Sequence, residues 1–309
     1  MTKQSPKADV YSRVTNRIIE SLEAGTRPWL KPWSTPKDDR LPELPVRANG
    51  TAYRGVNILL LWGDALDKGF TCKTWMTFKQ AEERGGHVRK GEKGSTVVYA
   101  DKATKTETDG TGEEVQREFG FMKSYTVFNV EQIDGLGEAF YQRPTPYDES
   151  QTPQLIEQAE AFFVNTGAEF RHRGDRAFYR IAGDFIQLPP LKAFRDAESY
   201  AATKAHELIH WTGAIGRMDR EFGTRFGDKA YAFEELVAEL GSAFLCSALG
   251  ITPEPRGDHA SYLAHWLQVL KADKRAIFTA ATHAQRAADY LHGLQATPEE
   301  IVEALSEAA

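Results

Sequence analysis

Hydrophobic residues recur with a helical period near the start of the chain. Four of them stand every four positions: Val10, Val14, Ile18 and Leu22. This spacing places them on one face and predicts a helix over residues 8–24, which Gly25 ends. A more strongly apolar run, residues 58–62, predicts a second helix that is buried on most sides, with Asn57 as its N-cap.

Shorter runs rich in Val, Tyr and Phe predict strands in the rest of the first half. The expected strands are residues 71–73, 96–100 and 119–128, and residues 75–81 predict a short helix that Gly85-Gly86 closes. The stretch 101–118 is polar with few apolar residues, so we expect a long mobile hairpin tip there.

The second half repeats this alternation with longer helices. Thr152-Pro153 has the pattern of a helix start, and strands are expected at residues 169–171, 177–181 and 185–188. Helices are expected over residues 200–211, 231–244, 258–272, 275–294 and 298–308. Residues 131–150 hold two prolines and no clear period, which predicts a linker. The sequence therefore predicts an α+β fold of two domains, residues 1–130 and 151–309.

The helix predicted over residues 200–211 carries the sequence His206-Glu207-Leu208-Ile209-His210. Histidines at positions i and i+4 share a face, so the two imidazoles can hold one metal ion, and Glu207 can reach a water on that ion. This is the zincin arrangement of two His ligands and a carboxylate general base. Leu208 and Ile209 are expected to pack inward. Zn²⁺ is the expected ion, with Mn²⁺ as the alternative.

The third ligand separates two branches of the zincins. Metzincins continue HExxHxxGxxH, and Gly213 fits that pattern, but Gly216 stands where the last ligand is needed and has no side chain to offer. The other branch takes a Glu from a later helix. The predicted helix 231–244 carries Glu235 and Glu239 on a face with small residues, which would let the two helices approach closely.

We therefore expect Glu235 to be the third ligand. Glu239 is expected to hydrogen-bond a ligand histidine. Glu234 is the first reserve ligand, and Asp219 is the second.

Composition places the chain among folded proteins of a reducing compartment. Of 309 residues 41% are apolar, and there is no apolar run of ~20 residues, so no membrane span is expected. No secretion signal is visible, and Cys72 and Cys246 are the two cysteines, which indicates a cytoplasmic protein without a disulfide framework. Net charge is uneven, at +4 for residues 1–130 and −10 for residues 131–309. The basic half favours a polyanionic partner.

Two stretches of the basic half are candidates for contacting nucleic acid. Arg27-Pro28-Trp29-Leu30-Lys31-Pro32-Trp33 interleaves cations with aromatic rings, the combination that holds single strands by stacking and charge. The alternative interpretation makes Trp29 and Trp33 core residues under an extended segment. Lys90 and Lys93, in a glycine-rich basic turn, are candidates for phosphate contacts, and the alternative is a solvated hairpin.

An ordered series of short motifs resembles the ArdC-type antirestriction proteins of conjugative plasmids. The motifs are Thr26-Arg-Pro-Trp, Lys31-Pro-Trp, Tyr53-Arg-Gly-Val-Asn, Trp75-Met-Thr-Phe-Lys-Gln-Ala, Gly183-Asp-Phe-Ile-Gln-Leu-Pro, His206-Glu-Leu-Ile-His-Trp-Thr-Gly and Phe233-Glu-Glu-Leu-Val-Ala-Glu. The N-terminal part also resembles part of the TraC-type plasmid primases. The resemblance implies an N-terminal domain that binds single-stranded DNA, for which Tyr53 and Arg54 are further candidate contacts. It also implies a C-terminal zincin-like metallopeptidase domain, and protection of incoming plasmid DNA from restriction.

Two functions of different classes follow. The first is a DNA-associated metalloprotease of unknown protein substrate, whose oxyanion is stabilised by one of Tyr179, Tyr200 and Tyr231, and whose strand beside the metal pairs with an extended peptide. The second is a protein that coats single-stranded DNA and whose metal site is structural or inactive. Glu207 argues against the second, because a structural site needs no base. The hypothesis of a nuclease is weaker than both, because nucleases favour carboxylate-rich sites that often hold two metals.

Overall fold

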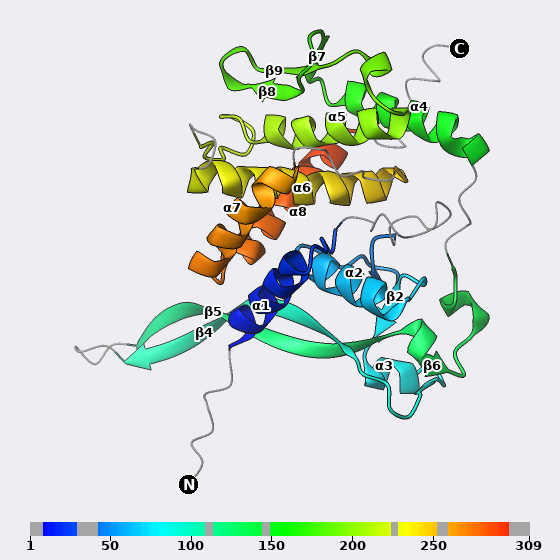
Figure 1. Ribbon diagram of the computed structural model, residues 1–309. Coiled ribbons are helices and arrows are strands. Elements are labelled where there is room, and N and C mark those ends of the chain that lie inside the picture. Colours follow the sequence, from blue (N-terminus) through cyan, green and yellow to red (C-terminus); the bar gives the residue numbers. More distant parts are fainter. Residues whose placement is uncertain are drawn as a thin grey trace, which may run out of the picture. The chain divides into compact units, whose positions relative to one another are not determined.

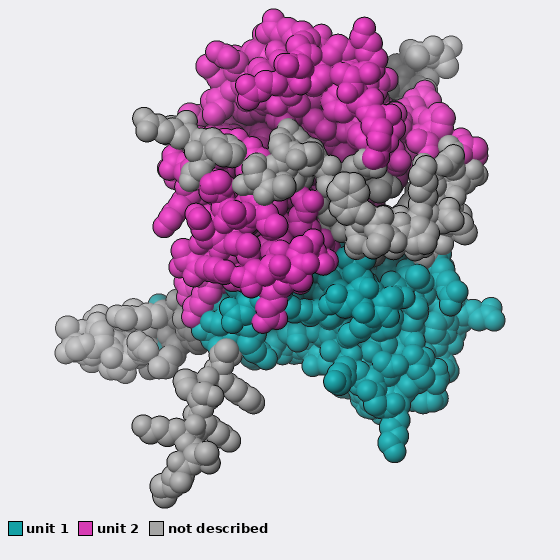
Figure 2. Space-filling model, viewed as in Figure 1, with its two compact units in different colours: residues 1–17, 45–143 teal, residues 18–44, 144–309 magenta. Residues whose placement is uncertain are grey.

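The computed structural model describes residues 9–29, 43–108, 114–143, 149–223, 228–251 and 259–296. The chain forms two compact units, Met1–Arg17 with Pro45–Arg143, and Ile18–Leu44 with Pro144–Ala309 (Figure 2). Each contains helices and a sheet, which confirms the predicted α+β fold of two domains. The boundary between the units falls within the first helix, α1 (Val10–Glu23). No described helix has the length and hydropathy needed to span a bilayer.

The first unit is built on a four-stranded sheet. Its strands are β1 (Val46–Arg47), β2 (Thr74–Met76), β4 (Ser95–Thr108) and β5 (Glu114–Asn129), in the order β1-β2-β5-β4. The sheet packs with helix α2 (Val56–Lys68), whose Leu59 and Leu61 are fully buried. A two-stranded sheet of β3 (His87–Val88) and β6 (Ile133–Asp134) and the short helix α3 (Phe78–Glu82) complete the unit (Figure 1).

Side-chain caps explain two differences from the predicted elements. Thr77 accepts a hydrogen bond from the backbone of Gln80 and forms a capping box with it, so α3 begins at Phe78 and the predicted helix 75–81 loses its first residues to β2. Asn57 does not cap α2. Its side-chain amide donates to the carbonyl of Val98 at 2.9 Å and accepts from the Val98 amide at 2.7 Å, and thereby fixes β4 to the helix.

The hairpin of β4 and β5 is longer than the sequence predicts. Its ladder runs without a break from Ser95 opposite Val127 to Thr108 opposite Glu114, so most of the predicted mobile tip 101–118 is strand. The prediction failed because residues 101–118 are mostly polar and show no regular apolar alternation. Residues 109–113 lie outside the described residues.

The predicted linker also differs. Residues 131–143 form the short helices η1 (Val130–Gln132) and η2 (Glu138–Phe140) and strand β6, and Ile133 and Leu136 are buried in the core of the first unit. The Tyr141 hydroxyl donates to the carbonyl of Ile133 at 2.7 Å. This segment therefore belongs to the first unit. Residues 144–148 lie outside the described residues.

The second unit stacks a small sheet on helices. The sheet has the order β7 (Glu169–His172), β9 (Phe185–Leu188), β8 (Phe178–Arg180), with β8 antiparallel at one edge. Its helices are α4 (Thr152–Asn165), α5 (Ala197–Thr212), α6 (Lys229–Leu249), α7 (His259–Ala272) and α8 (Ala276–Gly293). Short helices are η3 (Glu149–Gln151), η4 (Ile181–Gly183) and η5 (Leu191–Ala193). Figure 1 shows α5 between the sheet and α6. The helix predicted over 298–308 lies outside the described residues.

Close packing of α5 against α6 positions the candidate site. Leu208 and Ile209 are fully buried, as the apolar spacing predicted, and so are Leu236 and Leu240 of α6. Gly241 lies against Ile209, where an added Cβ would come within 2.9 Å of the Ile209 side chain. A larger residue at this position would push the two helices apart.

Candidate metal centre

Helix α5 is held at both ends. The Asp196 carboxylate accepts a hydrogen bond of 2.7 Å from the Ser199 amide and caps the first turn, and Gly213 ends the helix as predicted. The motif residues lie in its last two turns and are nearly inaccessible to solvent, with His206 4%, Glu207 3% and His210 8% exposed. Such polar side chains are buried at a cost in free energy unless they have partners, so the site needs compensating groups.

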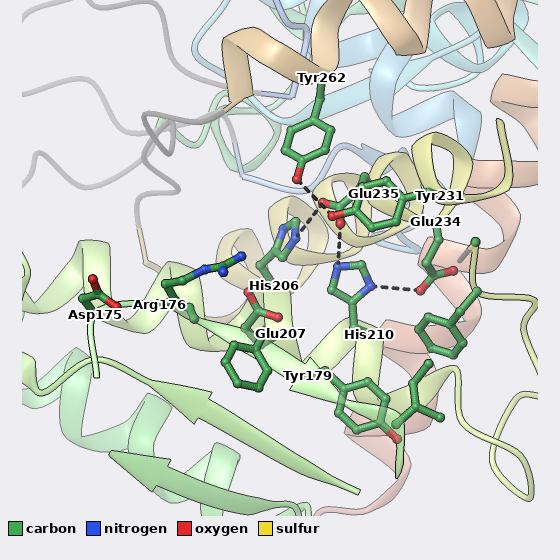
Figure 3. A pocket seen from close by; sticks show the side chains of 15 residues that line it. Asp175, Arg176, Tyr179, His206, Glu207, His210, Tyr231, Glu234, Glu235 and Tyr262 are labelled. Atoms are coloured by element: carbon green, nitrogen blue, oxygen red, sulfur yellow. Dashed lines mark hydrogen bonds and ion pairs between the residues drawn. The ribbon is translucent and has the colours of Figure 1, made fainter. Parts of the chain in front are cut away.

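Three ligating side chains converge between α5 and α6. His206 Nε2 lies 3.5 Å from one oxygen of the Glu235 carboxylate, and His210 Nε2 lies 3.6 Å from the other (Figure 3). Across the described ranges these residues form the one group of three or more His, Cys, Asp or Glu able to share an ion, with donor atoms all within 4.8 Å. Two ligands bound tetrahedrally to Zn²⁺ at 2.0–2.1 Å lie about 3.3 Å apart. The donor set and its spacing therefore fit a single divalent ion.

Glu234 orients the second histidine. Its Oε1 lies 3.1 Å from His210 Nδ1, and because a carboxylate only accepts, Nδ1 donates this hydrogen bond and Nε2 lies toward Glu235. Burial by itself lowers the pKa of His210, but the hydrogen bond to Glu234 and the charges of Glu235, Glu234 and Glu207 outweigh it and raise that pKa. Metal binding competes with this proton, because a ligand imidazole is neutral.

A buried arginine holds Glu234 in place. Arg220 Nε donates to Glu234 Oε2 at 3.0 Å and its Nη2 donates to Oε1 at 2.8 Å, while the same guanidinium also donates to the Thr212 hydroxyl and the Ile209 carbonyl. The side chains of Arg220 and Glu234 are 3% and 5% exposed. Burial raises the pKa of Glu234, but the hydrogen bonds from His210 and Arg220 dominate and lower it. The ion pair of Arg220 and Glu234 therefore fixes the carboxylate that hydrogen-bonds His210.

The site opens into a cavity of about 450 Å³. The edge strand β8 and the loop before it form one wall, through Arg176, Phe178 and Tyr179, and Tyr231 of α6 and Tyr262 of α7 form another (Figure 3). Asp219, the second reserve ligand, does not line this cavity. It lines a separate one, and its carboxylate accepts a hydrogen bond from the Gly216 amide.

Two of the three predicted oxyanion tyrosines line this cavity. The Tyr231 hydroxyl lies 3.1 Å from that of Tyr262, and burial together with the negative charge of Glu235 raises the pKa of Tyr231. The Tyr179 hydroxyl donates to Asp184 at 2.8 Å, and burial and that carboxylate raise the pKa of Tyr179 to about 12. Tyr200 lies elsewhere, with its hydroxyl 2.7 Å from His172 Nε2.

Comparisons with known proteins agree with this geometry. Residues 8–128 match the N-terminal domain of anti-restriction factor ArdC, and residues 157–283 match a zincin-like metallopeptidase domain. The crystal structure of metal-free antirestriction ArdC protein from the R388 plasmid is 45% identical, covers 93% of this chain and 98% of that one, and superimposes with a TM-score of 0.78. Its Mn(II)-bound form gives a TM-score of 0.73 at the same identity and coverage.

The chain belongs to the ArdC antirestriction family. A relative of unknown function from Sinorhizobium fredii, y4eC, is 42% identical over 95% of this chain and 94% of its own length. DNA primase TraC of Escherichia coli is 39% identical over 92% of this chain, which spans only 27% of the primase. The second unit of this ArdC-family protein thus has a zincin-like metallopeptidase fold, which implies a metal ion.

In the ArdC-family chain, two of the predicted DNA contacts are buried. Trp29 is fully buried in the second unit, where its Nε1 donates to Glu239 at 3.3 Å and its ring meets that of Trp266 edge-on. Tyr53 is 7% exposed in the core of the first unit. This burial favours the alternative interpretation of Trp29 as a core residue, and it leaves little of the Tyr53 ring exposed for a base.

The remaining predicted DNA contacts divide into three groups. Arg27 is half-buried, with one guanidinium nitrogen 3.7 Å from the Glu239 carboxylate, and burial lowers its pKa. Arg54, Lys90 and Lys93 are exposed and remain candidate contacts to DNA. Lys31 and Trp33 lie outside the described residues.

The contacts of Glu239 differ from the predicted ones. Glu234 is the carboxylate that hydrogen-bonds His210 Nδ1, and the described contacts of Glu239 are with Trp29 and Arg27. Spacing alone could not separate the two glutamates, since each lies on α6 within reach of α5. The signal that distinguishes them, Arg220, comes from an irregular loop whose path the sequence does not specify.

Proposed function

We propose that the second unit is a single-metal peptidase in which His206, His210 and Glu235 hold Zn²⁺ or Mn²⁺ and Glu207 is the general base. The observation that carries this proposal is the convergence of two imidazoles and a carboxylate on one face of a cavity that Glu207 also lines. A bound divalent ion acts there as a Lewis acid toward a carbonyl oxygen or a water. The histidine-rich, one-metal donor set favours peptide over phosphodiester hydrolysis.

The other residues of the cavity suit an extended peptide. Strand β8 is an edge of its sheet, so its free backbone groups can pair with a peptide laid along the cavity. Glu207 accepts the proton of the attacking water and delivers it to the leaving amine. The hydroxyl of Tyr231 donates a hydrogen bond to the oxygen that gains charge in the transition state, since the Tyr179 hydroxyl already donates to Asp184.

We propose further that the first unit binds single-stranded DNA and that the whole protein protects incoming plasmid DNA from restriction in the cytoplasm. Counted on the full sequence, the first unit carries 18 Lys and Arg against 15 Asp and Glu, a net charge of +3, whereas the second unit carries −9. The match to the ArdC N-terminal domain and the likeness to a DNA primase support the same partner.

The substitution Glu207→Gln tests the enzymatic part. It keeps the shape of the side chain and removes the base, so we expect peptide hydrolysis to fall by about 10²–10⁴-fold. Protection of an unmodified plasmid entering a restricting host should be lost with it, while metal content and DNA affinity stay at the wild-type level. Glu198→Gln, the same substitution at the start of the same helix, is the control.

The rival function is a protein that coats single-stranded DNA without proteolysis. It predicts full protection by the Glu207→Gln variant, and that result would reject the peptidase proposal. For the first unit, affinity for a single-stranded oligonucleotide should fall steeply as salt concentration rises, since phosphate contacts release counterions. Absent or salt-independent binding would reject the DNA-binding proposal.

A further inference from the structure

Two exposed tyrosines stand side by side on the β4–β5 hairpin of the first unit. Tyr99 is 49% and Tyr125 46% exposed, and their ring centroids lie 6.5 Å apart with an angle of 74° between the rings. Tyr99 pairs with Lys123 across the ladder, and Val97 pairs with Tyr125, so the two tyrosines are diagonal neighbours on the same face as Lys123.

This face of the hairpin continues from the core of the first unit. Closer to the base of the hairpin, Val97 and Val127 stand on the same face and are buried in a cluster with Leu61 of α2. Beyond them Tyr99 and Tyr125 are about half exposed, and Figure 1 shows the hairpin continuing well past α2. Large aromatic side chains that are exposed next to each other are typical of a binding surface.

The hairpin is held rigidly at this point. Asn57 of α2 forms two hydrogen bonds with the backbone of Val98, next to Tyr99, and Arg13 of α1 donates to the Ser124 hydroxyl at 3.1 Å, next to Tyr125. The rings are therefore presented on a fixed platform, which reduces the entropy lost when a ligand binds them.

We propose that Tyr99 and Tyr125 are a stacking platform for the bases of single-stranded nucleic acid, with Lys123 on the same face contacting the phosphates. The inference rests on the proposed DNA-binding function and assigns it to a surface. The two rings are steeply inclined to each other, so each offers its own face to one base. A cation beside two aromatic rings, in a unit of net charge +3, favours a polyanion with unpaired bases over a protein partner.

The test compares variants of the full chain in fluorescence-anisotropy titrations with a 20-nucleotide oligothymidylate at one fixed salt concentration. Stacking of about 1–3 kcal/mol per base corresponds to at least roughly 25-fold weaker binding for Tyr99→Ala with Tyr125→Ala. The matched control is Phe78→Ala, which removes another aromatic ring that is 51% exposed in the same unit. It should bind as the wild type does.

Two more variants separate stacking from folding. Tyr99→Phe with Tyr125→Phe keeps both rings and should bind within about twofold of the wild type. Lys123→Ala should reduce the slope of affinity against salt by about one phosphate contact. Wild-type affinity in the double alanine variant overturns the assignment while leaving DNA binding intact. A wild-type chain that does not bind the oligonucleotide would refute the DNA-binding function and the platform together.

Discussion

The substitution Glu234→Gln tests whether the carboxylate between His210 and Arg220 stabilises the site. The Glu234 carboxylate accepts one hydrogen bond from His210 and two from Arg220, and both charged side chains are almost completely buried. Gln has the same shape but no charge, so it leaves the Arg220 guanidinium buried without its counterion. Removing one partner of a buried ion pair costs about 3–5 kcal/mol, and we expect about 3 kcal/mol because the amide oxygen still accepts a hydrogen bond.

This loss is measurable in two ways. In the metal-free protein, 3 kcal/mol lowers the midpoint of thermal unfolding by about 6–12 °C for a unit of this size. Metal affinity should fall by about 10–100-fold, because His210 loses the charged group that fixes its tautomer and raises its basicity. Competition of the protein with a chromophoric chelator for Zn²⁺ measures that affinity directly.

Glu239→Gln is the matched control. Glu239 is also buried on α6, at 3% exposure, and its described contacts are with Trp29 and Arg27. We expect this variant to lose stability and to keep its metal affinity within about twofold. A larger loss of metal affinity in Glu239→Gln than in Glu234→Gln would refute this reasoning and return the supporting role to Glu239.

Three further predictions concern other parts of the chain. Trp29→Phe removes the donor to the buried Glu239 carboxylate and should cost about 1–3 kcal/mol in urea unfolding; an unchanged midpoint would show that the contact is unimportant. Asn57→Ala removes both bonds to Val98 and should speed amide exchange in the β4–β5 hairpin, with exchange in the second unit as the reference. Saturating Zn²⁺ at about 100 times its dissociation constant should stabilise the protein by about 2.7 kcal/mol over the chelated form, and stabilisation that survives in His206→Ala would place the ion elsewhere.

The core of the candidate site was predictable because its spacing is local. A helix of known period places His206 and His210 on one face, and the small residues of α6 indicate that it approaches α5. Strand β9 was predicted with the correct bounds, Phe185–Leu188, since Gly183-Asp184 and two prolines enclose a short apolar run.

What the sequence did not predict depends on contacts between distant segments. An aromatic ring beside cations has the same pattern whether it stacks on a base or fills a core, so the burial of Trp29 against α6 was open until the fold was known. The shared face of Tyr99 and Tyr125 arises from the register of two strands, and the polar composition of the hairpin concealed how far its strands extend. Arg220 reaches Glu234 from a loop without periodicity.

Anomalous diffraction at the zinc and manganese absorption edges tests the central claim most directly. Crystals grown with either ion should show one peak, bonded to Nε2 of His206, Nε2 of His210 and the carboxylate of Glu235 at about 2.0–2.2 Å, with Glu207 near the ion but outside its ligand shell. A peak ligated by Glu234 or Glu239, or histidine rings turned away from an ion bound elsewhere, would contradict the account.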